Sequence, residues 1–153
     1  MTSWKHFAAA EPELASRART LLTATTNAVL GTIRADGTPR LSGIDPFFVD
    51  GELWIGSMPH ARKGDDLKRD PRMALHGIPW ESRRVRDGSE DPGEGDVKLT
   101  GRAVHVTDPA EHAGPSDRFR IEPDAVVVIA VADDQLVVDR WSATGGRTTV
   151  RRS

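Results

Sequence analysis

The spacing of apolar positions along the chain changes near residue 27. Before it, residues 11–25 carry Pro12, which suits a first helical turn, and an apolar face at helical spacing. That face consists of Leu14, Ala18, Leu21, Leu22 and Thr25. After Asn27, short apolar runs separated by turn-forming residues take over. The pattern predicts one N-terminal helix over 11–25 followed by a series of strands.

Two Asp-Gly pairs separate the first three predicted strands. The run Ala28–Ile33 ends at Asp36-Gly37, and the run from Pro39 to Val49 ends at Asp50-Gly51. Residues 53–56 form the next apolar run. Asp-Gly between two apolar runs is a strong hairpin signal. These three segments therefore predict an antiparallel β-meander.

The rest of the chain alternates further strands with short breaks. Pro59 and Pro71 bracket a predicted short helix, and residues 108–119 predict a short helix or turn. Residues 80–96 are rich in charge, glycine and proline, which predicts an exposed loop that either covers a substrate pocket or is inert. Strands are predicted at 72–78, 97–106, 125–131, 135–141 and 148–151. We expect one mainly β (α+β) domain over residues 1–153, an antiparallel barrel of six to eight strands with two or three short helices.

Composition limits the class of protein. The 153 residues are 37% hydrophobic and 29% charged, which is typical of a globular domain. No apolar run approaches the roughly 18 residues that cross a bilayer, and the N-terminus lacks an apolar signal core. The absence of cysteine excludes disulfides, thiolate nucleophiles and Cys-type metal sites. With a net charge of −2, we expect a cytoplasmic protein that binds neither membrane nor nucleic acid.

Sequence motifs for common catalytic centres are missing. The chain has no Gly-x-Ser-x-Gly elbow, no His-Glu-x-x-His pair and no glycine-rich phosphate loop. Its five histidines are scattered, and we expect no metal site.

Residues 56–63, Gly-Ser-Met-Pro-His-Ala-Arg-Lys, carry the most informative chemistry. A strand ends at Ser57, and a helix begins with Arg62 and Lys63 in its first turn, where positive charge opposes the helix dipole. Free backbone N–H groups at a helix start bind phosphate, and both side chains add donors. The run therefore predicts an anion site. The alternative is a solvated basic turn paired with Asp65 or Asp66.

An ordered set of motifs resembles the pyridoxamine 5′-phosphate oxidase-like family. The resemblance covers about residues 27 to 106, and the motifs keep the family's order and spacing. They are Leu30-Gly31-Thr32-Ile33, Asp36-Gly37-Thr38-Pro39-Arg40, residues 51–57, Ala61-Arg62-Lys63, residues 67–72 and Lys98-Leu99-Thr100-Gly101-Arg102-Ala103. Proteins of this family are split barrels that bind flavin mononucleotide (FMN) or the deazaflavin coenzyme F-420.

The resemblance implies roles for individual residues. Arg62 and Lys63 would bind the cofactor phosphate together with the strand end at Ser57 and Met58. The flavin ring would lie against the second strand, and the implied contacts there and on the later strand are Arg40, Leu41, Ser42, Gly43, Ile44 and Lys98. The family also implies a homodimer with the cofactor at its interface. The partner would then contribute Trp141, Arg147 and Arg151 to the site. In the alternative interpretation, Trp141 is an ordinary strand aromatic and the two arginines keep a terminal strand soluble.

The resemblance also implies redox chemistry, because a flavin or deazaflavin carries its own hydride chemistry. The chain departs from the true oxidases at Thr149, where they have a substrate-contacting histidine, and at Ala61, and it is shorter. These differences point away from vitamin B6 as the substrate. We therefore expect an FMN-binding oxidoreductase acting on another small molecule. The alternatives are a deazaflavin-dependent reductase, a non-catalytic flavin- or haem-binding protein, and a phosphate- or nucleotide-binding module without a redox role.

Overall fold

The computed structural model describes residues 2–24, 27–77, 95–111 and 114–153. Its three helices are α1 (Trp4–Ala10), α2 (Pro12–Thr23) and α3 (Arg62–Arg69). Its nine strands are β1 (Ala28–Ile33), β2 (Pro39–Ile44), β3 (Phe47–Val49), β4 (Glu52–Ser57), β5 (Arg72–Gly77), β6 (Asp96–Val106), β7 (Asp117–Ala132), β8 (Gln135–Ser142) and β9 (Gly146–Arg152). None of the helices in these ranges is long and apolar enough to cross a membrane.

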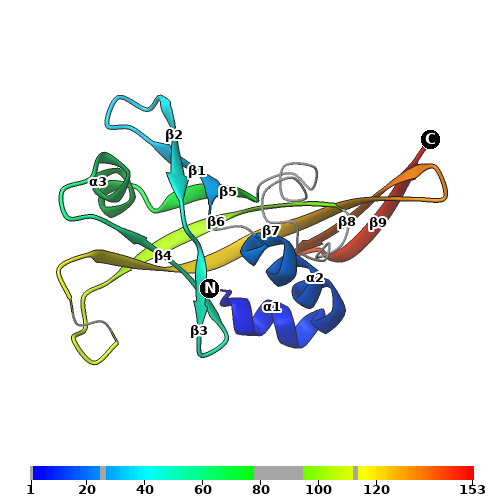
Figure 1. The fold of residues 1–153 in the computed structure, drawn as a ribbon, viewed down its shortest axis with the longest axis horizontal. Coiled ribbons are helices and arrows are strands. Elements are labelled where there is room, and N and C mark those ends of the chain that lie inside the picture. The colour runs from blue at the N-terminus through cyan, green and yellow to red at the C-terminus, as the bar shows by residue number, and fades with distance from the viewer. Residues whose placement is uncertain (1, 25–26, 78–94, 112–113) are drawn as a thin grey trace.

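All nine strands join one antiparallel sheet in the order β2-β1-β5-β6-β7-β4-β3, with β8 between β7 and β9. Strand β7 belongs to two parts of this sheet. Its first residues pair with β4, and residues 125–132 pair with β8. Figure 1 shows the consequence: the β8–β9 hairpin extends away from the strands around β1 and β2, and the C-terminus lies at that far end.

A bulge in β7 marks the point where its partner changes. The register against β6 shifts between Thr100 and Gly101, so that Asp124 is left out of the ladder. Pro123 lies at this point, which fits the preference of proline for bulges within a sheet. A Cβ at position 101 would overlap the carbonyl oxygen of Glu122, so the sheet requires glycine there.

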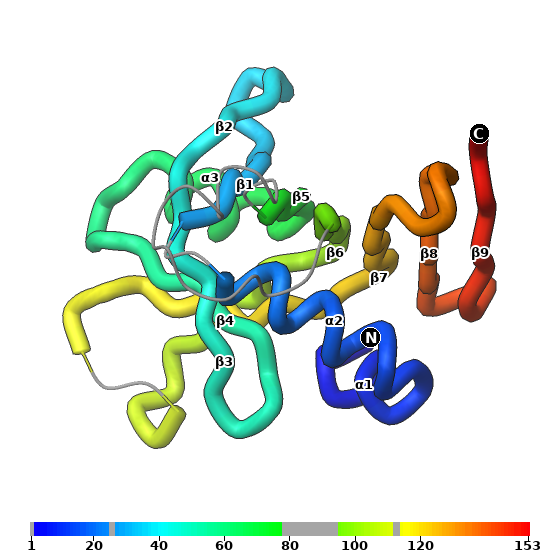
Figure 2. The backbone as a smooth tube through the Cα atoms, turned by 45° about the vertical axis from the view of Figure 1, so that its right-hand side comes forward, coloured from blue at the N-terminus to red at the C-terminus, as the bar shows by residue number. Residues whose placement is uncertain are grey.

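Helices α1 and α2 close one side of the sheet beside β7, while α3 lies near β1 at the opposite end (Figures 1 and 2). The apolar face of α2 is buried as predicted, through Leu14, Ala18, Leu21 and Leu22. Helix α1 adds aromatic rings. Phe7 is fully buried, with its ring 5.1 Å from that of Trp4 and 4.7 Å from that of Trp141.

The predicted β-meander is wrong. The single strand predicted from Pro39 to Val49 is two strands, because Pro46 has no N–H for a ladder and residues 45–46 leave the sheet. Strand β2 then pairs with β1, whereas β3 pairs with β4 at the other end of the strand order. Both Asp-Gly hairpins are nevertheless present, with Gly37 and Gly51 at positive φ.

Other element boundaries also differ from the prediction. Helix α1 was not predicted, and β7 begins at Asp117 rather than 125. Among the described residues of the predicted helix or turn over 108–119, residues 109–111 form a turn. The remaining predicted strands and the helix between Pro59 and Pro71 are confirmed within a few residues. Residues 80–94 of the predicted loop lie outside the described residues. Asp96, which was predicted to end the loop, is the first residue of β6.

Candidate functional site

The start of α3 is built by a sharp turn after β4. His60 adopts a left-handed conformation with φ of +64°, which turns the chain into the helix behind Pro59. Ala61 is the N-cap and supplies no capping side chain, and the first intrahelical bond reaches the N–H of Asp65. The N–H groups of Arg62, Lys63 and Gly64 therefore lack intrahelical acceptors and can donate to an anion.

A cavity of about 340 Å³ opens beside this helix start. It lies between the end of β2, the end of β4 and the first turn of α3. Its lining residues are Asn27, Gly43, Ile44, Asp45, Gly56, Ser57, Met58, Lys63 and Ser116. Five of the thirteen predicted cofactor contacts, Gly43, Ile44, Ser57, Met58 and Lys63, are thus brought together although they come from three separate elements.

Lys63 and Ser57 lie close to backbone groups in this cavity. Lys63 Nζ donates to the carbonyl oxygen of Gly43 at 3.1 Å, and Ser57 Oγ donates to that of Met58 at 3.2 Å. Helix and strand are close here, since a Cβ at Gly64 would lie 3.0 Å from Ser57 Oγ. The arrangement places one ammonium group and one hydroxyl group beside the uncapped helix start.

Arg62 is exposed at the same helix start. Within the described residues, no carboxylate lies within ion-pair distance of Arg62 or Lys63, because Asp66 pairs with Arg40 and Arg69 instead. This does not fit the alternative of a basic turn neutralised by Asp65 or Asp66. Two positive side chains and free N–H groups favour a bound anion.

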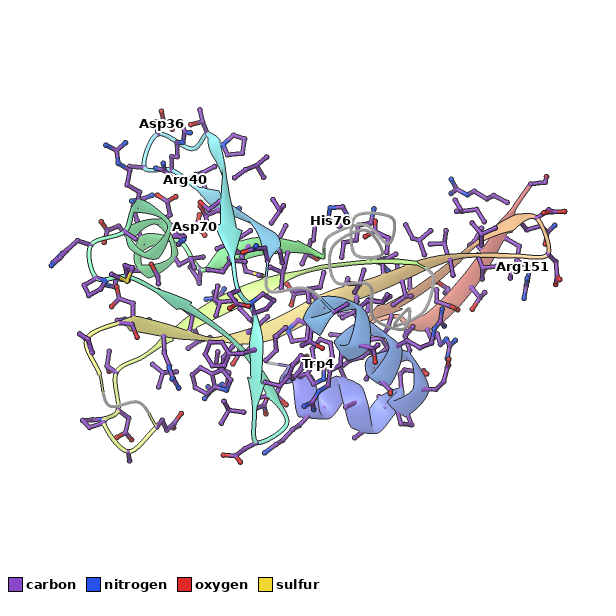
Figure 3. All side chains as sticks on the ribbon, in the orientation of Figure 1. Trp4, Asp36, Arg40, Asp70, His76 and Arg151 are labelled. Carbon is purple, nitrogen blue, oxygen red and sulfur yellow. The ribbon has the colours of Figure 1, made fainter. Side chains whose placement is uncertain are left out.

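Arg40 does not line this cavity. Its Nε donates to Asp66 Oδ2 at 2.7 Å, and Thr32 Oγ1 donates to the same oxygen at 2.7 Å. Arg69 donates to Asp66 Oδ1 at 3.1 Å. Burial works to raise the pKa of Asp66, but these hydrogen bonds outweigh it and hold the pKa below its ordinary value. Asp66 thus holds Arg40 beside α3, and Figure 3 shows this corner of the molecule.

A second cavity, of about 640 Å³, lies over the middle of the sheet. Two further predicted contacts, Leu41 and Lys98, line it, together with mostly apolar residues of β1, β5, β6 and β7. The side chain of Leu41 is 77% exposed, whereas Ser42 is half-buried on the other side of β2. The predicted contacts on β2 therefore divide between two cavities and two faces of the strand.

A histidine–carboxylate pair in this second cavity was not predicted. His76 Nε2 lies 2.7 Å from Asp96 Oδ2, across the neighbouring strands β5 and β6. Their separation in sequence gave no spacing signal, and Asp96 had been placed in the loop over 80–96. Across the part of the chain that the structure describes, no three His, Asp or Glu side chains are grouped so as to hold a metal ion.

Comparison with known proteins gives the family. The family model for pyridoxamine 5′-phosphate oxidase matches residues 14–136. The chain belongs to the pyridoxamine 5′-phosphate oxidase family. The resemblance seen in the motifs is confirmed, and so is the fold class: a mostly antiparallel split barrel with three helices in the described ranges. No protein of curated function matches the chain in sequence.

Several solved structures have a similar fold at low sequence identity. A pyridoxamine 5′-phosphate oxidase-related, FMN binding protein from Nostoc punctiforme has a TM-score of 0.62 and 10% identity, covering 96% of both chains. PhzG from Burkholderia lata, in complex with tetrahydrophenazine-1-carboxylic acid, has a TM-score of 0.60 and 15% identity over 97% of this chain and 87% of that one. A heme binding protein from Mycobacterium smegmatis has a TM-score of 0.58 and 18% identity, covering 92% of this chain and 59% of that one.

The C-terminal residues that the family implies for the partner's site lie in the β8–β9 hairpin. Trp141 is only 3% exposed and packs against Phe7, as a strand aromatic of the core would. Arg147 pairs with Asp139 at 3.2 Å and Glu13 at 3.1 Å. Arg151 is exposed, and Figure 3 places it at the opposite end of the molecule from Arg40. Any contact of Arg151 with a cofactor bound near α3 would therefore come from another chain.

Asp139 organises the base of this hairpin. It is buried, and it accepts hydrogen bonds from Arg17 on α2 at 3.0 Å and from Thr149 on β9 at 2.5 Å, besides Arg147. Burial acts to raise the pKa of Asp139, and the hydrogen bonds from these three side chains lower it below the ordinary value. Thr149, at the position where the resemblance implies a histidine in the true oxidases, thus makes a structural hydrogen bond in this chain.

Proposed function

We propose that this chain binds FMN, with the phosphate at the start of α3, and acts as a flavin-dependent oxidoreductase on a small organic molecule. The observation that carries the proposal is the cavity in which Lys63, Ser57 and the uncapped helix start meet the end of β2. A phosphate there would accept from backbone N–H groups, from Ser57 Oγ and from Lys63 Nζ. Arg62 does not line the cavity, but it is exposed in the same helical turn and would add a further positive charge.

The chain's own residues hold and orient the group in this proposal. When bound, FMN supplies the hydride chemistry. With the phosphate beside Lys63, the ring would extend along β2, where Gly43 and Ile44 line the smaller cavity and Leu41 lines the larger one. We place the small-molecule substrate in the larger, mostly apolar cavity, where Lys98 and Arg140 offer positive charge to an acidic group.

We further propose a homodimer whose second copy covers this face. Leu41 is 77% exposed and Met58 is 75% exposed, so that two large apolar side chains flank the cofactor site. Exposed apolar side chains of this size suit an interface. Leu41→Asp should shift the mass measured by light scattering from dimer to monomer and weaken FMN binding. A wild-type chain that is monomeric with FMN bound would contradict the dimer.

The cofactor is tested by parallel fluorescence titrations of the purified chain with FMN and with coenzyme F-420. We expect preferential binding of FMN. Because each charge-assisted contact contributes roughly 1.5–3 kcal/mol, Arg62→Ala with Lys63→Ala should weaken binding by at least about a hundredfold. Arg34→Ala removes one exposed charge from the β1–β2 turn and should leave the affinity unchanged. Equal affinity in the double variant and the wild type would contradict the anion site, and preferential binding of F-420 would support the deazaflavin alternative.

Haem binding is a second candidate because of His76. A histidine whose other ring nitrogen contacts a carboxylate is a common arrangement for a metal-binding imidazole. Asp96 contacts Nε2 of His76, which leaves Nδ1 as the nitrogen for a metal. The pair lies in a largely apolar cavity of about 640 Å³, and a structural neighbour is a heme binding protein. Haem titration followed at the Soret band tests this. A Soret band that is lost in His76→Ala would favour haem. If the wild type shows no Soret band with haem, FMN remains the proposed cofactor.

A further inference from the structure

A third cavity, of about 650 Å³, lies at the opposite end of β4 from Ser57. It is bounded by α1, the β3–β4 turn, the turn after β6, and β7. Its lining residues are Ser3, Lys5, His6, Val49, Asp50, Glu52, Trp54, Ala110, Glu111, Arg120 and Glu122. This volume is within the range of small-molecule sites, and none of the predicted cofactor contacts lines it.

Alternation along two paired strands creates the polar wall of this cavity. Trp54 on β4 lies opposite Arg120 on β7. Their chain neighbours Leu53, Ile55, Phe119 and Ile121 all belong to the hydrophobic core. Since successive side chains point to opposite faces of a strand, Glu52, Trp54, Arg120 and Glu122 share the other face. Trp54 and Glu122 are nevertheless only 7% and 8% exposed.

Three buried polar atoms on this wall have no hydrogen-bond partner among the described residues: Glu52 Oε2, Trp54 Nε1 and Glu122 Oε2. Asp117 Oδ2 also lacks a hydrogen bond by geometry, but it lies elsewhere and is paired with Lys68 Nζ at 2.9 Å. Burying a polar atom without a partner is costly, so native proteins rarely leave one unpaired. Two acceptors and one donor on residues that line one cavity therefore indicate a polar partner from outside the chain.

The charges around the cavity indicate what that partner is. Four carboxylates line it, Asp50, Glu52, Glu111 and Glu122, against Lys5, Arg120 and His6. Arg120 is 3.5 Å from Glu111, and its guanidinium lies over the Trp54 ring at 6.0 Å. Within the described chain, neither Glu52 nor Glu122 has an ion-pair partner, and no three acidic or histidine side chains form a metal site. The two acceptors favour a cation, and the indole donor favours an acceptor on the same molecule; an organic cation offers both, whereas a bare metal ion offers no acceptor.

We propose that this cavity binds a small organic cation. Its amine or guanidinium N–H groups donate to the carboxylates of Glu52 and Glu122, and it carries a hydroxyl or carbonyl acceptor for Trp54 Nε1. Because these polar atoms are buried, the three side chains rotate toward the cavity when the cation binds. The site is separate from the proposed cofactor site, because no residue lines both cavities. The proposal therefore does not rest on FMN binding.

The test uses the indole N–H signal of Trp54 in ¹⁵N-labelled protein, assigned by its loss in Trp54→Phe. Ethanolamine and argininamide are the probes, and ethylene glycol is the uncharged counterpart of ethanolamine. We expect at least one cation to shift the Trp54 signal at saturable concentration, and ethylene glycol to leave it in place. Glu122→Gln should weaken the binding about tenfold or more, because one charge-assisted contact is lost.

Controls separate this site from charge in general and from the cofactor. Asp134→Asn removes a carboxylate from the exposed β7–β8 turn and should leave the affinity unchanged, as should Lys63→Ala. If Glu122→Gln fails to fold, Glu52→Gln replaces it. The proposal is overturned if neither probe moves the Trp54 signal, if both glutamine variants bind as the wild type does, or if a crystal structure grown with the probes shows only water molecules bonded to the three atoms.

Discussion

Arg40 and Asp66 form an ion pair in which the guanidinium uses its Nε, 2.7 Å from Asp66 Oδ2. The pair joins β2 to α3, the helix that begins with the positive residues of the proposed phosphate site. Thr32 extends the same connection to β1. One buried carboxylate thus fixes the position of the helix relative to both strands of the first hairpin.

Replacing Asp66 should destabilise the fold, because Asp66 connects α3 to β1 and β2. Asp66→Ala leaves Arg40 and Thr32 without their shared partner, and we expect a loss of about 2–4 kcal/mol in the free energy of unfolding. Urea denaturation followed by circular dichroism measures it. Asp65→Ala, at the exposed neighbouring position of the same helix, is the control and should change stability by less than about 0.5 kcal/mol. Similar losses in both variants would contradict a special role for Asp66.

Stability should fall in acid because of Asp66 and Asp139. Both have a folded-state pKa below the ordinary value of 3.8, so their ionised forms stabilise the fold above about pH 4, and this contribution disappears as pH falls through the folded pKa. Asp139→Asn should lower stability at pH 7 and flatten the acid limb of a plot of unfolding free energy against pH. A variant that keeps the wild-type slope below pH 4 would contradict the assignment.

Phe7 should be essential for docking α1. It is fully buried between Trp4 and Trp141, and Phe7→Ala leaves a cavity that should cost about 3–5 kcal/mol. Thermal or urea unfolding gives the loss, and near-ultraviolet circular dichroism reports the loosened tryptophans. Phe47→Ala removes the same side chain from a half-buried position and should cost less. A loss below about 1 kcal/mol in Phe7→Ala would mean that α1 contributes little through this ring.

Arg151 tests whether a partner chain completes the proposed FMN site. Arg151→Ala should leave the unfolding free energy unchanged, because the side chain is exposed, and should weaken FMN binding about tenfold if the partner's Arg151 contacts the phosphate. Arg152→Ala is the matched control, since it removes the same charge from the next residue, whose side chain points to the other face of β9. Identical FMN affinities in the two variants would exclude the assignment.

The sequence predicted most elements where local signals agree with the tertiary structure. Helix α2 follows from its apolar face, and two hairpins follow from Asp-Gly pairs. Two errors arose at prolines. Pro46 separates β2 from β3, whereas Pro123 introduces a bulge without ending β7. Helix α1 had a usable signal, because the Ser3 side chain caps it by accepting from the His6 N–H.

The candidate site was predictable only in part. The basic helix start was visible because Ser57 and Lys63 are close in sequence, and the family resemblance added Gly43 and Ile44. Neither the His76–Asp96 pair nor the joining of Glu52 and Trp54 with Glu122 could be predicted, because each depends on which distant strands become neighbours. Strand periodicity gives the face on which a residue lies, but it does not give the partner strand.

The packing of Phe7 against Trp141 has a consequence for biosynthesis. The first helix leaves the ribosome long before β8, so the Phe7 ring lacks its contact with Trp141 until that strand has been made. Contacts between such distant parts of a chain also slow folding. A nascent chain of this protein should therefore depend on chaperones that hold apolar segments, and a stop codon before β8 should yield an insoluble product rather than a smaller folded one.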